Sequence, residues 1–291
     1  MPTTEGQNQP DINDQELAGL DALETVSGER RNFVASVWSN TWPKLGALII
    51  GLFLWQVVVW SEWKPEYILP GPRKTFGTLW EMLGDGTIWR ASGTTMRRAI
   101  VGYLLAVVIG LVIGAVVARV RAVRAAFGSF ITGIQTMPSI AWFPLAIVLF
   151  QLSERAILFV VVLGAAPAIA NGLISGSDNI PPVLLRAGKV LGARGWNSFR
   201  HVIFPAALPG LVSGLKQGWA FAWRSLMAGE LLVIIKGKPS IGSMLQENRA
   251  VNDYQGLLAV MIVILVIGIV IDSAVFGRLE LAVRRRWGLE A

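Results

Sequence analysis

The sequence predicts an all-α protein that crosses a membrane several times, with six membrane-spanning helices. Of its 291 residues, 53% are hydrophobic and only 15% are charged, whereas a soluble domain carries about a quarter charged residues. The mean hydropathy is +0.55. The charges gather in short stretches between long apolar runs, as expected where a charge in hydrocarbon costs at least a few kcal/mol.

The composition also excludes several kinds of site. The chain has no cysteine and one histidine, His201, so we expect no disulfide, no metal site and no thiol or histidine catalysis. The formal net charge of +7 is compatible with nucleic-acid binding. However, the basic residues lie at the ends of apolar runs, where lipid headgroups attract them, and we expect membrane lipid and no nucleic acid as a partner.

The N-terminal part divides into three regions. Residues 1–31 are acidic and poor in large apolar side chains, which predicts a disordered cytoplasmic tail. Residues 32–60 contain the first apolar run, 45–60, and predict the first transmembrane helix. Residues 61–98 are expected to form a polar extracytoplasmic connection, in which Phe76, Leu79, Trp80 and Leu83 have helical spacing. This amphipathic helix is interpreted either as a cap in solvent or as a helix in the membrane surface, which we favour.

Residues 99–277 contain five further apolar runs and predict the core of the protein. The predicted spans are 99–118, 126–152, 156–175, 210–235 and 257–276. Pro138 breaks the span 126–152. Two series of glycines four residues apart predict close helix packing: Gly110 and Gly114, and Gly210, Gly214 and Gly218. For the second series we expect packing against a twin subunit or against span 99–118.

The distribution of basic residues orients the chain. Six spans place both termini on one side of the membrane. The segments on the side of the termini, which include the basic tail 278–291, hold fourteen basic residues, whereas those on the other side hold ten, six of them in the long connection 61–98. Basic residues in short loops favour the cytoplasm. The prediction is therefore a bacterial inner-membrane protein with cytoplasmic N- and C-termini.

Residues 184–205 are the polar segment with the most specific pattern. Here Gly192 permits a bend between two helical stretches. The small residues Ala187 and Gly188 leave one helix face without large side chains, and Pro205 is expected to stop the element before the next span. Such an elbow suits docking in a groove of another protein. The alternative is an ordinary interfacial helix.

The spacing of this segment resembles the coupling motif of permeases of ATP-binding-cassette (ABC) importers: EAA, three residues, Gly, nine residues, I-x-L-P. The matching positions are Arg186, Ala187, Gly188, Gly192, Val202, Phe204 and Pro205, with departures at 186, 188, 202 and 204. The tracts ILPGP, TMRRAIVGYLLAVVIGLVIG and AWFPLAIVLF are similar to the nitrate, sulfonate, taurine and bicarbonate branch of that family.

The resemblance implies a type I importer permease that works as two copies with two ABC ATPase subunits and an extracytoplasmic solute-binding protein. The chain lacks a GxxxxGK[ST] phosphate loop, so ATP and Mg are expected on the separate ATPase, and this chain is no enzyme. The expected solute is a small anion, most specifically an aliphatic sulfonate or taurine. Nitrate, bicarbonate or a small carboxylate are alternatives.

Candidates for the solute pathway are the ionisable residues within the spans and the residues around the break at Pro138. They are Gln135, Met137, Ser139, Trp142, Arg224 and Glu230. Arg224 is interpreted either as an anion ligand or as the partner of Glu230 or of backbone carbonyls freed by Pro138 or Pro167. Trp142 is interpreted either as part of the pathway or as packing. Asp272 is expected to pair with Arg278 or its neighbours. A secondary transporter would need more acidic residues in the spans, and a membrane enzyme would need a catalytic cluster, which the sequence lacks.

Overall fold

The computed structural model describes residues 33–286, and in this range all regular structure is helical. The chain forms two compact units, Met1–Trp63 and Lys64–Ala291. In the first unit the helix α2 (Phe33–Trp60) contains the predicted first span, and its section Trp42–Trp60 is long and apolar enough to cross a membrane. The predicted acidic tail, 1–31, lies outside the described residues.

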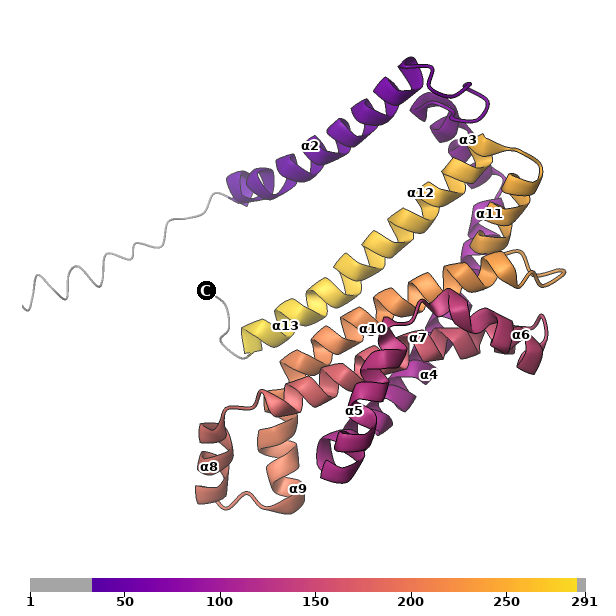
Figure 1. Ribbon diagram of the computed structural model, residues 1–291. Coiled ribbons are helices and arrows are strands. Elements are labelled where there is room, and N and C mark those ends of the chain that lie inside the picture. Colours follow the sequence, from indigo (N-terminus) through magenta and orange to yellow (C-terminus); the bar gives the residue numbers. More distant parts are fainter. Residues whose placement is uncertain (1–32, 287–291) are drawn as a thin grey trace, which may run out of the picture. The chain divides into compact units, whose positions relative to one another are not determined.

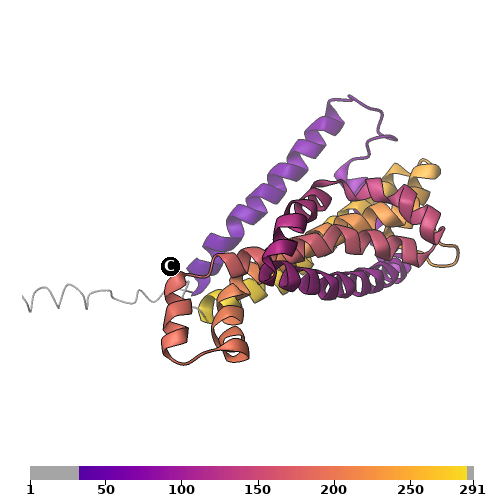
Figure 2. The same cartoon turned by 60° about the horizontal axis from the view of Figure 1, so that its bottom comes forward.

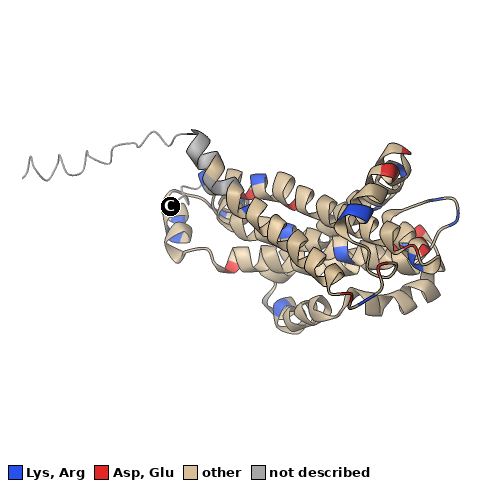
Figure 3. Cartoon of the chain, turned by 90° about the horizontal axis from the view of Figure 1, so that it is seen from above, with Lys and Arg blue, Asp and Glu red and all other residues tan. Residues whose placement is uncertain are grey.

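The second unit is a bundle of long helices with short helices at both ends (Figure 1). Its elements in chain order are α3 (Pro72–Gly84), α4 (Thr87–Arg119), α5 (Arg121–Thr136), η1 (Ser139–Trp142), α6 (Phe143–Phe150), α7 (Glu154–Asp178), α8 (Pro182–Val190), α9 (Gly195–Ser198), η2 (Phe199–Ile203), α10 (Phe204–Leu232), α11 (Ile241–Ala250), α12 (Tyr254–Ile271), η3 (Asp272–Gly277) and α13 (Arg278–Arg286). Most positions along the long helices are uncharged (Figure 3).

Four helical stretches of the described chain have the length and hydropathy of membrane spans, and a bent pair of helices makes a fifth. The pair is 122–136 with 139–150, and its two parts meet at 102° across the break at Pro138. The remaining predicted span, 210–235, is helical up to Leu232 as part of α10, but it is not among these apolar stretches and carries Lys216, Arg224 and Glu230. Since α10 packs against α7, α4 and α11, less of its surface has to face lipid than in an isolated span.

Helix α7 is the centre of the bundle and packs along both α4 and α10, which also contact each other. Small residues let the backbones approach closely. A Cβ added at Gly110 of α4 would lie 2.7 Å from the Ala166 carbonyl oxygen, and one added at Gly114 would lie 3.0 Å from that of Ala170. These distances are shorter than van der Waals contact, so neither glycine can be replaced without parting the helices.

The glycine series of α10 also packs against α7. Gly210 lies against Gly176, Gly214 against Gly172 and Gly218 against Ile169. The prediction that these glycines pack against span 99–118 is wrong. Helix α7 also covers the glycine surface for which a twin subunit was the other predicted partner. The physical reason is that α7 contributes glycines of its own at matching spacing, so two side-chain-free ridges meet.

The amphipathic helix predicted near residue 76 is α3, but its apolar residues divide between two sides. Leu79 and Leu83 pack with Met82 against a cluster formed by α4, α11 and α12. Phe76 and Trp80 point outward, and Trp80 is 78% exposed. The following turn is fixed by Asp85, whose carboxylate accepts a hydrogen bond from the Thr87 backbone N–H. This bond holds the pKa of Asp85 below its usual value.

Candidate functional site

The segment 184–205 forms a bent element at one end of the bundle. Helix α8 ends where the Leu191 N–H donates to the Ala187 carbonyl oxygen at 3.0 Å, and the Ala193 N–H then bonds to the Gly188 carbonyl oxygen at 2.9 Å. Gly192 has φ +82, a left-handed conformation that residues with a Cβ adopt only at a cost. The chain can therefore reverse direction here and enter α9.

One packing contact joins the two arms of residues 184–205, which we call the coupling elbow after the motif that they resemble. Gly188 is buried against Val202, and a Cβ at Gly188 would lie 2.8 Å from a Val202 methyl carbon. Trp196 stacks on Phe199 with ring centroids 5.3 Å apart. The Arg119 guanidinium at the end of α4 lies over the Phe199 ring, 5.2 Å from its centroid. The elbow is thus a defined unit rather than a loose loop.

The tip of the elbow exposes large apolar side chains. Val190 is 87% exposed, Leu191 is 86% exposed and Trp196 is 67% exposed. Both views show α8 and α9 projecting from the end of the long helices (Figures 1 and 2). Arg186 and Ala187 are also exposed. Exposed apolar side chains gathered on a projecting element are typical of a surface that binds another protein.

The expectation that Pro205 stops the elbow before the next span is wrong. The helix runs without a break from α9 through η2 into α10, and Pro205 lies in the first turn of α10. Residues 199–203 have the wider π-helical turn, which is a known way to accommodate local disruption of the backbone ladder. Phe204 is exposed and Pro205 is half-buried at this junction. The elbow is therefore joined directly to the long helix α10.

The predicted pathway residues of the third span surround its break. Met137 is exposed, whereas Gln135, Ser139 and Trp142 are half-buried. Gln135 accepts a hydrogen bond from the Asn171 side chain of α7 at 2.6 Å. Trp142 packs against the main hydrophobic core, and η1 contacts α10. The break thus lies beside the helix that carries Arg224.

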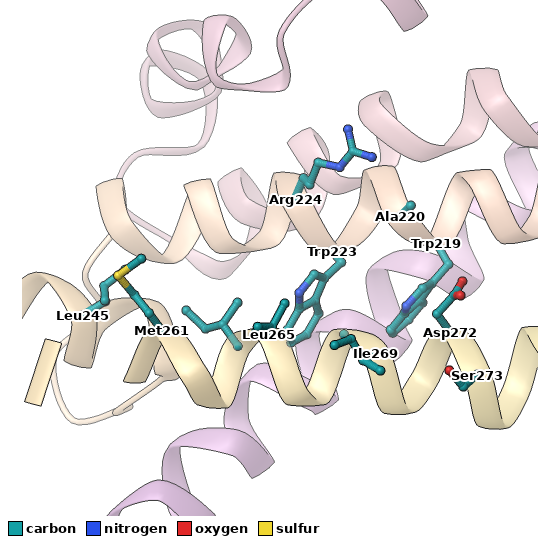
Figure 4. A pocket seen from close by; sticks show the side chains of 12 residues that line it. Trp219, Ala220, Trp223, Arg224, Leu245, Met261, Leu265, Ile269, Asp272 and Ser273 are labelled. Atoms are coloured by element: carbon teal, nitrogen blue, oxygen red, sulfur yellow. The ribbon is translucent and has the colours of Figure 1, made fainter. Parts of the chain in front are cut away.

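Arg224 is exposed on α10, and its guanidinium lies 5.3 Å from the Phe221 ring centroid. Within residues 33–286 it makes no ion pair. Trp219 and Trp223 line an open groove of about 620 Å³ between α10 and α12. Arg224 and Asp272 also line this groove, although most of its lining residues are apolar. Figure 4 shows both tryptophans pointing toward α12, while the Arg224 guanidinium extends away from α12.

Glu230 does not pair with Arg224, so that alternative is wrong. Its carboxylate is fully buried and accepts a hydrogen bond at 2.9 Å from Arg98 of α4, which is 3% exposed. Thr95 Oγ1, one helical turn earlier, donates to the same carboxylate at 2.8 Å. Arg98 and Thr95 were not singled out from the sequence, because residue 98 ended the region assigned to the polar connection. Helix α4 begins at Thr87, well before the predicted span.

A second predicted pair also differs from expectation. Asp272 lies near Lys216 of α10, with 3.8 Å between carboxylate and ammonium, and not beside Arg278. The same Lys216 ammonium lies 3.6 Å from Glu280. Both distances exceed 3.5 Å, so neither contact is a hydrogen bond.

Comparison with known proteins identifies the family. Residues 106–285, more than half of the chain, match the family described as binding-protein-dependent transport system inner membrane component. The chain belongs to this family. It is a permease subunit of an ABC importer and a multi-pass protein of the inner membrane, in the branch that includes nitrate, sulfonate and taurine permeases.

Curated relatives named for different solutes match most of the chain. The chain is 29% identical to a putative ABC transporter permease protein of Methanocaldococcus jannaschii, over 66% of this chain and 71% of the relative. It is 25% identical to the taurine transport system permease protein TauC of Escherichia coli, over 78% of this chain and 84% of the relative. Other relatives are named for riboflavin, aliphatic sulfonates and nitrate.

Solved structures support the fold. A chain of the MetNI methionine ABC transporter in an inward-facing conformation matches with a TM-score of 0.56 and 21% identity, covering 67% of this chain and 94% of that chain. At this identity the match establishes the fold alone, which is that of an importer permease.

Proposed function

We propose that this permease carries a small organic anion, most specifically taurine or an aliphatic sulfonate, into the cell, and that residues 184–205 transmit the driving force. The observation that carries the proposal is the exposed apolar tip of the coupling elbow, formed by Val190, Leu191 and Trp196. The elbow is continuous with α10. A protein seated on this tip can therefore move a helix of the bundle.

The driving force comes from a separate ATPase subunit that binds ATP and Mg. In this arrangement two copies of the chain assemble with two ATPase subunits, and an extracytoplasmic protein delivers the solute. The elbow then faces the cytoplasm, and both termini lie on that side. When the ATPases close around ATP, the elbows approach one another and α10 moves with them. This motion exposes the solute pathway to alternate sides of the membrane.

The choice of an anion rests on Arg224. Its guanidinium is exposed and has no carboxylate partner in the described part of the chain. Its planar group binds sulfonates and carboxylates through two parallel hydrogen bonds. The relatives named for taurine, aliphatic sulfonates and nitrate handle anions of this kind. The relative named for riboflavin is an exception, so the solute has to be tested directly.

The coupling role is tested by co-purification from cells that express the whole transporter. Gly192→Trp places a large side chain on the elbow at a left-handed position, and we expect it to reduce the co-purified ATPase about tenfold. The matched control is Gly77→Trp, because Gly77 lies on α3 and also has open space around it. Equal recovery of the ATPase with both variants would contradict the coupling role, as would proton- or sodium-driven uptake by the purified chain alone.

The solute is tested by uptake in a strain that lacks this subunit. Complementation should restore uptake of taurine or an alkyl sulfonate, and Arg224→Gln should reduce it with the complex still assembled. Restored uptake of nitrate, bicarbonate or a carboxylate, without uptake of sulfonates, would assign the alternative solute.

A further inference from the structure

The carboxylate of Glu230 ties three helices together at the end of α10. Arg98 and Thr95 of α4 donate to it at 2.9 and 2.8 Å, and the Gly242 backbone N–H of α11 donates at 3.1 Å. Thr95 Oγ1 in turn accepts from the Ile241 N–H at 2.9 Å. The first two backbone N–H groups of α11 are therefore bound by side chains of α10 and α4. A carboxylate is well suited to this position at a helix N-terminus.

Gly242 is required for this contact. A Cβ at this position would collide with the Cβ of Glu230. The close approach brings the start of α11 directly onto the last turn of α10. In the described chain the two helices are thus joined by a buried hydrogen-bond network rather than by side-chain packing alone.

The other edge of Arg98 faces a second carboxylate. Its Nε and Nη2 atoms are buried and have no hydrogen-bond partner among the described residues, and Nη2 lies 3.6 Å from Glu154 at the start of α7. Glu154 also binds Lys238 at 2.8 Å and Arg97 at 3.2 Å. Arg98 therefore lies between an acidic residue of α10 and an acidic residue of α7.

This network lies at the opposite end of α10 from the coupling elbow. Glu230 follows the start of α10 by 26 residues, from Phe204 to Glu230, which corresponds to about 39 Å of helix at 1.5 Å per residue. Figure 1 shows α8 and α9 at one end of the bundle and α11 at the other. Between these ends, α10 packs Gly210 and Gly214 against glycines of α7, and farther along it packs Trp219, Ala222 and Leu226 into the hydrophobic core.

A buried ion pair is weak evidence for stability, because well-packed apolar residues often serve as well. What the pair does provide is a fixed geometry among the helices that meet there. A charged group that loses its buried partner is strongly disfavoured, so α10 cannot shift without carrying Arg98 and the start of α11 with it.

We propose that Arg98, Thr95 and Glu230 are positioning residues that clamp the far end of α10 to α4 and α11, and that this clamp links the solute-binding protein outside to the ATPase inside. The inference rests on the proposed function, since it assumes that the elbow binds an ATPase and that α11 lies on the extracytoplasmic side. Movement of the elbow then reaches the outer face through α10, and docking of the binding protein reaches the ATPase by the same route.

The test uses the complete transporter reconstituted in liposomes, with the ATPase subunits and the solute-loaded binding protein. The readout is a ratio of two rates: the rate of ATP hydrolysis with the binding protein divided by the rate without it. Thr95→Val removes the hydroxyl at nearly constant volume, and we expect the ratio to fall about tenfold, within the usual range of coupling between sites. Thr95→Ser keeps the hydroxyl and should retain the ratio. Lys74→Gln removes only an exposed ion pair with Glu66 and is the matched control.

A second set of variants separates clamping from simple charge balance. Glu230→Gln should lower the ratio, and the double variant Arg98→Gln/Glu230→Gln should remain low although it buries no unpaired charge. A wild-type ratio in Thr95→Val, or recovery in the double variant, would overturn the clamp. The clamp would also be overturned if the ratio fell only in proportion to the amount of assembled complex and Thr95→Ser did not restore it. If wild-type liposomes show no ATP-dependent uptake, it is the proposed function that fails.

Discussion

Replacing Gly214 by alanine tests the glycine seam between α10 and α7. The new Cβ would lie 2.6 Å from the Gly172 Cα, whereas ordinary van der Waals contact begins at 3.4 Å, so the helices must part by about 0.8 Å. The neighbouring atoms are backbone and cannot rotate away. Overpacking of this kind costs about 1–3 kcal/mol, and in a domain of 150–250 residues each kcal/mol lowers Tm by roughly 2–4 °C.

We therefore expect Gly214→Ala to melt between about 2 and 12 °C below the wild type, and solute uptake to fall while membrane insertion is retained. Melting is followed by near-UV circular dichroism of the purified complex in detergent. The control is Gly133→Ala in α5, where a Cβ meets nothing within 4 Å and alanine favours the helix. A Gly214→Ala complex that melts like the wild type would refute the close approach of α10 and α7.

Two further substitutions examine other contacts of α10. Gly242→Ala should lower both Tm and uptake, because its Cβ collides with Glu230; wild-type values in melting and uptake assays would exclude that contact. Tyr103→Phe removes the hydrogen bond from the phenol to the Leu215 carbonyl oxygen at 2.8 Å and should cost about 0.5–1.5 kcal/mol. An unchanged melting temperature for this variant would show that the bond contributes nothing.

The sequence was sufficient for features that depend on neighbouring residues. Apolar runs located most helices, Pro138 marked the bend of 102°, and the positive φ of Gly192 agrees with the predicted turn of the elbow. These features follow from hydropathy, proline geometry and the conformational freedom of glycine, which act within a few residues.

Pairings between distant residues could not be predicted in the same way. The sequence favoured Glu230 as a partner of Arg224, six residues away, but its actual partner is Arg98, 132 residues away. Which helices adjoin is decided by packing of the whole bundle. Likewise, the glycines of α10 indicated a close approach without specifying α7 as the helix that fits them.

One signal for Arg98 was nevertheless present. Along α4 the buried positions include Ala91, Thr95, Arg98, Gly102 and Ala106, spaced three or four residues apart. This stripe of small residues continues through the polar end of the helix. A polar residue on such a stripe is expected to be buried and paired, so the stripe indicated both Thr95 and Arg98 as members of a buried network.

The orientation and docking of the coupling elbow are tested most directly by cysteine labelling. The native chain has no cysteine, so single cysteines can be placed at Leu191 on the elbow and at Val251 between α11 and α12, which are 86% and 67% exposed. In whole cells that express the transporter, a membrane-impermeant maleimide should label residue 251 and not residue 191. A thiol crosslinker at residue 191 should capture the ATPase subunit. Labelling of residue 191 from outside, or no crosslink to the ATPase, would contradict the account.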